Sequence, residues 1–199
     1  MRICFFGDSF TQGVGDDRGL GWCGRLTPRM RGRHPDLTAY ALGIRRDTSA
    51  EILARWESEA RARLPHGHPH RLAFCFGTND CADDGTGRGR VSPAETLRNA
   101  TAILAGAAAM APVILVGPPP ALDDPAVDRR IAALEPGLGA VAKEAGIPFL
   151  SVFGTLRQAP AWTAGAAAGD GTHPAGAGYA LLADLIGDWP AFRHWADIA

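Results

Sequence analysis

The sequence predicts an α/β fold of three layers, in which helices cover both faces of a five-stranded parallel sheet. Four short apolar runs, each followed within a few residues by glycine, have the continuity of strands that are buried on both faces. Helical patterns with their own start signals lie between these runs. Such alternation is typical of a doubly wound sheet, because right-handed crossovers place successive helices above and below the strands.

The predicted strands are short and evenly distributed along the chain. In chain order they are the runs at 3–6, 37–42, 72–76, 113–116 and 149–152. The second of these mixes apolar with polar residues, so we expect it at an edge of the sheet. Five strands in a chain of 199 residues favour a flavodoxin-like α/β/α arrangement with the strand order 2-1-3-4-5.

Four helices are predicted from start signals that precede apolar residues at helical spacing. Thr48-Ser49-Ala50-Glu51 and Ser92-Pro93-Ala94-Glu95 each have the form of a capping box, which satisfies free backbone groups at a helix start. A third helix opens at Asp124-Pro125, and we expect Pro136 to kink or split it, because proline lacks the N–H that a helix interior uses. A fourth follows Pro174. One face of this last helix carries Tyr179, Leu182 and Ile186.

Composition indicates one ordinary globular domain, and we expect residues 1–199 to form it without a linker or repeat. The formal charge of −1 provides no basic surface, so no nucleic-acid partner is expected. Lys143 is the only lysine, which leaves no Gly-Lys pair for a P-loop. The four cysteines lack C-x-x-C spacing, so a zinc ribbon or redox dithiol is disfavoured. We expect neither a metal nor another cofactor.

The sequence lacks the apolar segments of exported or membrane proteins. The first apolar run, at 3–6, is too short for a signal peptide, and no other run could cross a bilayer. We therefore expect a cytoplasmic protein without stable membrane insertion, whose partner is a small-molecule substrate.

Polar residues that can carry acyl-transfer chemistry follow the predicted strands. The carboxyl ends of parallel strands meet at one edge of a sheet, where ligands bind. A serine hydroxyl becomes a nucleophile when an imidazole takes its proton and a carboxylate holds that imidazole in the required tautomer. Ser9, His173 and Asp170 can supply these three groups. The backbone N–H groups of Ser9 and Gly43 and the side-chain amide of Asn79 can stabilise the resulting oxyanion.

These residues resemble the motifs of the GDSL esterases and lipases, also called SGNH hydrolases. The resemblance rests on four blocks in the family's order, Gly7-Asp8-Ser9-Phe10, Gly43, Gly77-Thr78-Asn79-Asp80 and Asp170-x-x-His173. It implies a cofactor-independent serine hydrolase with a flavodoxin-like fold. Ser9, Asp170 and His173 would be catalytic, and Ser9, Gly43 and Asn79 would form the oxyanion hole. Phe10 replaces the leucine of the family motif, and we expect it to pack rather than react.

Three interpretations of function remain open from the sequence. The first is hydrolysis of carboxylic ester or thioester bonds through an acyl-serine intermediate. The second, within the same family, is removal of O-acetyl groups from carbohydrate. The third is a catalytically silent flavodoxin-like binding module, in which the same motifs serve only as helix caps and turns.

Three other segments contain patterns that predict a functional site less strongly. Gly19-Leu20-Gly21-Trp22-Cys23-Gly24 matches a dinucleotide-binding pattern but follows no strand directly, so it does not predict such a site. His66, His68 and His70 alternate in what we expect to be a solvated loop rather than a zinc site. The segment 81–91 is rich in glycine, and we expect it to be mobile and to form one wall of an acyl pocket.

Overall fold

The computed structural model describes residues 1–198, which contain a five-stranded parallel sheet in the order β2-β1-β3-β4-β5. The strands are β1 (Arg2–Gly7), β2 (Thr38–Gly43), β3 (His70–Cys75), β4 (Val113–Val116) and β5 (Phe149–Leu150). The predicted fold class, the strand order and the edge position of the second strand are confirmed. The order reverses between β1 and β3, which is the place where open sheets of this kind bind ligands.

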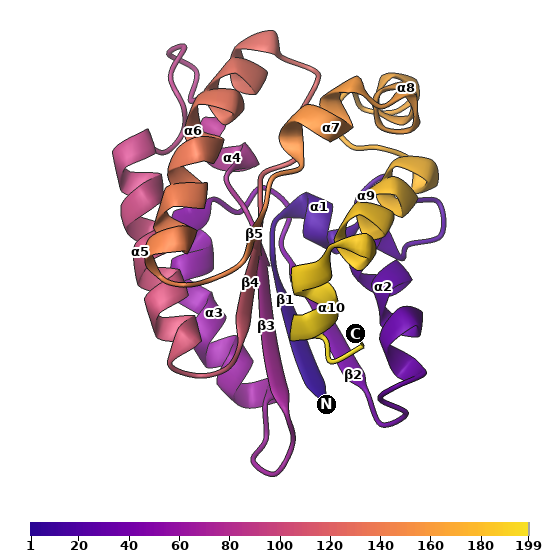
Figure 1. Ribbon diagram of the computed structural model, residues 1–199. Helices are drawn as coiled ribbons and strands as arrows, with labels where there is room; N and C mark the ends of the chain where they lie inside the picture. The colour runs from indigo at the N-terminus through magenta and orange to yellow at the C-terminus, as the bar shows by residue number, and fades with distance from the viewer. Residues whose placement is uncertain (199) are drawn as a thin grey trace.

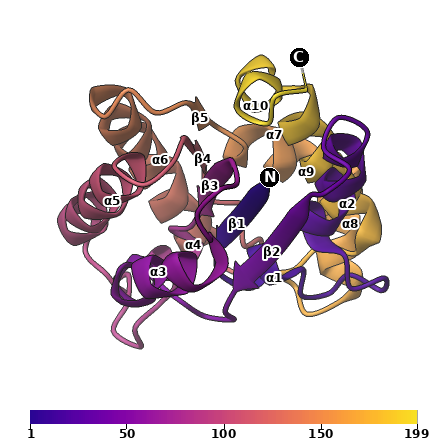
Figure 2. The same ribbon diagram turned by 90° about the horizontal axis from the view of Figure 1, so that it is seen from below.

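Helices cover both faces of the sheet, as Figure 1 shows from the side and Figure 2 from below. One layer consists of α3 (Ser49–Arg63), α5 (Pro93–Ala108) and α6 (Pro125–Glu144). The other consists of α2 (Gly21–Arg31), α8 (Pro160–Ala168), α9 (Gly176–Asp188) and α10 (Pro190–Trp195). Single turns of helix, α1 (Ser9–Gln12) and α4 (Thr78–Cys81), follow β1 and β3, and α7 (Phe153–Gln158) follows β5. In the described part of the chain, no helix is both long and apolar enough to cross a membrane.

Alternate residues of the central strands fill two separate cores. In β1, Cys4 and Phe6 belong to the core beneath α3, α5 and α6, whereas Ile3 and Phe5 belong to the core beneath α2, α9 and α10. All four are fully buried. This two-residue period explains why the strands are apolar throughout, because a strand that is covered on both faces has no side exposed to water.

All four predicted helices are present, and three of their starts have capping hydrogen bonds; α9, which follows Pro174, has no side-chain cap. The Thr48 backbone N–H donates to the Glu51 carboxylate at 2.6 Å, as a capping box requires. The Ser92 hydroxyl accepts the backbone N–H of Glu95 at 3.3 Å. The Asp124 carboxylate accepts the N–H of Ala126 at 2.7 Å and so caps α6.

Two expectations about element lengths are wrong. Pro136 does not split its helix, because α6 continues from Pro125 to Glu144, and a kink at Pro136 stays a prediction. Leu134 and Leu138 are buried on either side of the proline, and this packing outweighs one missing backbone hydrogen bond. The fifth strand has two residues instead of four. It ends early because the Glu135 carboxylate accepts the N–H of Val152 at 3.2 Å and turns the chain into α7.

Candidate active site

Ser9 begins α1 immediately after β1, at the end of the sheet where the strand order reverses. The Asp8 carboxylate accepts the N–H of Phe10 at 2.9 Å and caps this short helix. Gly7 is required at the turn, because a Cβ atom there would lie 2.1 Å from Thr11 Oγ1 and 2.3 Å from the Cys75 carbonyl oxygen. The Ser9 side chain is thereby fixed at the floor of a cleft, with the residue only 3% exposed.

The fold brings Ser9 next to His173 and Asp170. His173 Nε2 lies 2.8 Å from Ser9 Oγ, and His173 Nδ1 lies 2.7 Å from Asp170 Oδ2. The other oxygen of Asp170 accepts the backbone N–H groups of Thr172 at 3.1 Å and His173 at 2.8 Å. Hydrogen bonds within this short loop therefore fix the position of the Asp170 carboxylate relative to the His173 imidazole. The three groups form a continuous hydrogen-bonded chain in the order serine, histidine and aspartate.

Hydrogen bonding keeps the Asp170 carboxylate ionised. Partial burial raises the pKa of Asp170, but the hydrogen bonds from the His173 backbone N–H and imidazole lower it by more, to about 2. At neutral pH an ionised Asp170 can only accept, so His173 Nδ1 carries the proton and Nε2 faces Ser9 as an acceptor.

Phe10 supports the imidazole of His173. Its ring centroid lies 5.0 Å from that of His173, and the Phe10 ring also stacks against Trp162, with the centroids 5.8 Å apart. Phe10 is 1% exposed. The expectation that Phe10 packs is confirmed, because the aromatic ring fills the space beside the histidine and restricts its movement.

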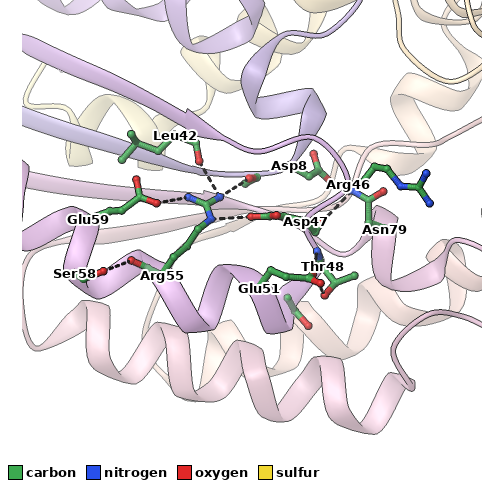
Figure 3. Close-up of polar contacts among 12 residues, drawn as sticks. Asp8, Leu42, Arg46, Asp47, Thr48, Glu51, Arg55, Ser58, Glu59 and Asn79 are labelled. Carbon is green, nitrogen blue, oxygen red and sulfur yellow. Dashed lines mark hydrogen bonds and ion pairs between the residues drawn. The ribbon is translucent and has the colours of Figure 1, made fainter.

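Asn79 lies on α4 and lines the same cleft as Ser9 and His173. Its Nδ2 donates to Asp8 Oδ2 and to the Asp47 carbonyl oxygen, each at 3.1 Å. Figure 3 shows Asn79 beside both partners. Both amide hydrogens therefore already have acceptors. An oxyanion can receive one of these hydrogens only if Asn79 shares it or releases an acceptor.

Gly43 ends β2 and packs directly against α1. A Cβ atom at Gly43 would lie 2.3 Å from the Gln12 nitrogen and 2.4 Å from the Asp8 carbonyl oxygen. Among the described residues that line the cleft, Gly43 does not appear. The backbone around α1 occupies the space that a side chain at position 43 would need, so packing alone requires glycine here. A role for the Gly43 N–H in an oxyanion hole stays a prediction.

The cleft has a volume of about 390 Å³ and a polar, charged lining. Beyond Ser9, His173 and Asn79, the charged residues that line it are Arg45, Arg46, Arg90, Asp83, Asp123 and Asp124. Its apolar lining residues are Phe10, Ala82, Ala121 and Val127. The three arginines could not be predicted from the sequence, because they lie on loops whose approach to the site depends on the whole fold.

The glycine-rich segment 81–91 forms part of the cleft wall through Ala82, Asp83 and Arg90. An isolated antiparallel bridge joins Asp83 to Gly89, and the Arg90 guanidinium donates to the Arg46 carbonyl at 2.7 Å. From α6, Arg130 donates to the Cys81 carbonyl at 2.6 Å. The segment thus has more hydrogen bonds than its glycines led us to expect, and its mobility stays a prediction.

The chain belongs to the GDSL-like lipase/acylhydrolase family, whose model matches residues 5–181. No curated protein is significantly similar to it in sequence. Solved structures share its fold at low identity. LAE5, an α/β hydrolase from the metagenome of Lake Arreo, is 22% identical with a TM-score of 0.73, and the match covers 99% of this chain and 95% of LAE5.

Two further structures are similar to the same degree. The acetylxylan esterase Axe2 from Geobacillus stearothermophilus is 21% identical with a TM-score of 0.73, over 98% of this chain and 93% of Axe2. A member of the lipolytic G-D-S-L family from Veillonella parvula is 21% identical with a TM-score of 0.72, over 93% and 95% of the two chains. At this level of identity, the similarity to these structures shows the fold alone and does not indicate a substrate.

The close packing of Gly43 gives a first prediction. Gly43→Ala should lower the free energy of unfolding by about 1–3 kcal/mol, because the new methyl group overlaps the backbone of α1. Gly32→Ala is the matched control, since Gly32 has an ordinary φ of −58° and no atom within 4 Å of its Cβ position. Urea denaturation measures both. Equal stability of the two variants would contradict the packing account.

The buried carboxyl of Asp8 gives a second prediction. Burial raises the pKa of Asp8 from 3.8 to about 7, against the lowering effect of the Phe10 N–H. Between about pH 4 and pH 7 the unfolded chain has lost this proton while the folded protein keeps it, so stability falls as the pH rises. Asp8→Asn cannot lose a proton at this position. The free energy of unfolding of the variant should therefore fall less than that of the wild type between about pH 4 and pH 7. If the free energies of unfolding of the wild type and Asp8→Asn differ by the same amount at every pH, the raised pKa of Asp8 is refuted.

Proposed function

We propose that this protein is a serine esterase that hydrolyses short-acyl esters of polar alcohols through an acyl-Ser9 intermediate. The observation that carries the proposal is the hydrogen-bonded chain from Ser9 Oγ to His173 Nε2, at 2.8 Å, and from His173 Nδ1 to Asp170, at 2.7 Å. Membership of a lipase/acylhydrolase family supports the same class of reaction.

In the acylation step, Ser9 Oγ attacks the ester carbonyl while its proton passes to His173 Nε2. The carbonyl π electrons move to oxygen and form a tetrahedral oxyanion. When this intermediate collapses, the bond to the alcohol oxygen breaks and His173 returns its proton to that leaving oxygen. Asp170 stabilises the imidazolium that exists between the two transfers, and its low pKa keeps it ionised throughout.

In the deacylation step, water takes the place of the alcohol. His173 Nε2 accepts a proton from the water, whose oxygen attacks the acyl carbon and forms a second tetrahedral oxyanion. Collapse breaks the bond to Ser9 Oγ, which recovers the proton from His173, and the carboxylic acid leaves. The enzyme is regenerated without a cofactor.

Three donors are proposed to stabilise both oxyanions, the N–H groups of Ser9 and Gly43 and the Asn79 amide. Asn79 and Ser9 line one cleft, which supports their joint action on the same oxygen atom. The Asn79 amide has to share one of its hydrogens, because Asp8 and Asp47 accept both before substrate arrives.

The charged lining of the cleft supports a small acyl group on a polar alcohol. A long acyl chain gains affinity from continuous apolar surface, whereas six charged side chains line this cleft and would lose hydration against such a chain. Polar side chains suit the hydroxyl groups of a carbohydrate. The likeness to an acetylxylan esterase supports O-acetyl carbohydrate as the substrate class.

A second candidate, hydrolysis of longer acyl esters or thioesters, is favoured by one specific observation. A largely apolar cavity of about 380 Å³ is lined by Cys81, Val91, Pro93, Ala133 and Leu134, and its charged lining residues are Asp80, Arg88 and Arg130. It adjoins the glycine-rich segment that also walls the polar cleft. Displacement of that segment would open this cavity to an acyl chain.

Rates on a series of esters distinguish the candidates. With p-nitrophenyl esters from acetate to palmitate, kcat/KM should be highest for acetate and fall by at least about 10-fold by octanoate, since each added methylene meets polar surface. Acetylated xylo-oligosaccharide should be deacetylated. Ser9→Ala serves as the blank and should lose roughly 10⁴- to 10⁶-fold in kcat.

Rates that rise with chain length would favour the second candidate. Wild-type turnover in a folded Ser9→Ala variant would refute the serine mechanism for both.

A further inference from the structure

Arg55, on the second turn of α3, reaches beneath the cleft and contacts the ends of β1 and β2. Its Nη2 donates to the carbonyl oxygens of Gly7 and Leu42, each at 3.0 Å. Its Nε donates to Asp47 Oδ2 at 2.7 Å, and its Nη1 donates to Glu59 Oε1 at 3.0 Å. Figure 3 shows the guanidinium between Leu42, Asp47 and Glu59. One side chain therefore ties two strands, a loop and a helix together.

The contact with Leu42 fixes the direction of the Gly43 N–H. The Leu42 carbonyl and the Gly43 N–H belong to the same peptide unit, which is planar and trans. A guanidinium that holds the carbonyl oxygen therefore sets where the N–H points. Hydrogen bonding at the carbonyl also polarises the peptide and strengthens its N–H as a donor.

The contact with Asp47 fixes the Asn79 amide. Arg55 holds the Asp47 side chain, and the Asp47 backbone carbonyl accepts Asn79 Nδ2 at 3.1 Å. Asp47 is 9% exposed, so little water competes for these contacts. Without Arg55, the Asp47 carboxylate would be a buried charge without its guanidinium partner and would be driven to turn toward solvent. The carbonyl that orients Asn79 would move with it.

We infer that Arg55 is a positioning residue for the oxyanion hole, because its guanidinium fixes both the Leu42–Gly43 peptide and Asp47, the acceptor of Asn79. This inference rests on the proposed function. Arg55 is absent from the lining of the cleft among the described residues. It acts through two of the three proposed donors, which lie in parts of the sequence 36 residues apart, at Gly43 and Asn79.

The test is the kinetic effect of Arg55→Met, which keeps an apolar stem and removes every donor. Since the donors strengthen their bonds only as negative charge develops, kcat for p-nitrophenyl acetate should fall by roughly 10- to 100-fold while KM changes by less than about threefold. Arg55→Lys should show the same pattern with a smaller loss, because one ammonium cannot reach both carbonyls and the carboxylate. Thermal unfolding gives the folded fraction of each variant.

Arg63→Met is the matched control. Arg63 lies on the same helix and pairs with the same acidic residue, Glu59, at 3.5 Å, but contacts neither strand end nor Asp47. Its guanidinium lies over the Tyr40 ring. Arg63→Met should keep the wild-type kcat. This control distinguishes a general effect of removing an arginine from α3 from the effect that is specific to Arg55.

A double-mutant cycle with Asn79→Ala separates positioning from a general structural role. If Arg55 acts through the oxyanion hole, Arg55→Met should cost at least about threefold less in kcat when Asn79 is already alanine. A role in stability alone would cost the same factor in both backgrounds. Should Arg55→Met fail to fold, Arg55→Lys takes its place in the cycle.

A loss confined to KM, or equal factors in the two backgrounds, overturns this inference alone, because Ser9→Ala would still abolish turnover. Activity that survives Ser9→Ala overturns the proposed function and this inference with it.

Discussion

The parallel register of β1 with its two neighbours is the constraint on which the site depends. Gly7 at the end of β1 lies opposite Gly43 of β2 and Cys75 of β3, so the three strands end at the same level. The segments that leave these strands carry Ser9 and Asn79, and they converge because consecutive peptide units of a parallel ladder cannot slide. The loop 170–173 then needs only to approach this edge for His173 to reach Ser9.

Polar groups buried beneath that edge hold the converging segments. Asp8 caps α1 and accepts from Asn79, and Asp47 accepts from Asn79 and Arg55. Asp8, Asp47 and Arg55 thereby order the cleft floor around Asn79. Asp47 and Arg55 are costly to bury as charges, and their ion pair offsets that cost. Rigid support of this kind favours catalysis, because donors that are already oriented need not reorganise during the reaction.

The parts of the fold that follow local rules could be predicted from the sequence. Apolar runs indicated the strands, and the capping residues Thr48, Ser92 and Asp124 indicated three helix starts. Among the helices that we did not predict, α2 and α7 have no side-chain cap and no proline at their starts, whereas α8 and α10 begin at Pro160 and Pro190, a signal that the sequence does carry. The resemblance to the family motifs predicted Ser9, Asn79 and His173 as site residues. It could not reveal Arg55, whose partners at Gly7, Leu42 and Asp47 meet only through tertiary packing.

Activation of Ser9 by His173 can be tested by covalent labelling of the serine. A fluorophosphonate should add to Ser9 of the folded protein, with fluoride as leaving group, and mass spectrometry of the digested protein locates the adduct. The buried Ser9 should react in preference to the exposed Ser151, and His173→Ala should slow the labelling at least about 100-fold, because only an activated serine reacts. Absence of an adduct on Ser9, or labelling unaffected by His173→Ala, would contradict the account and favour a silent binding module.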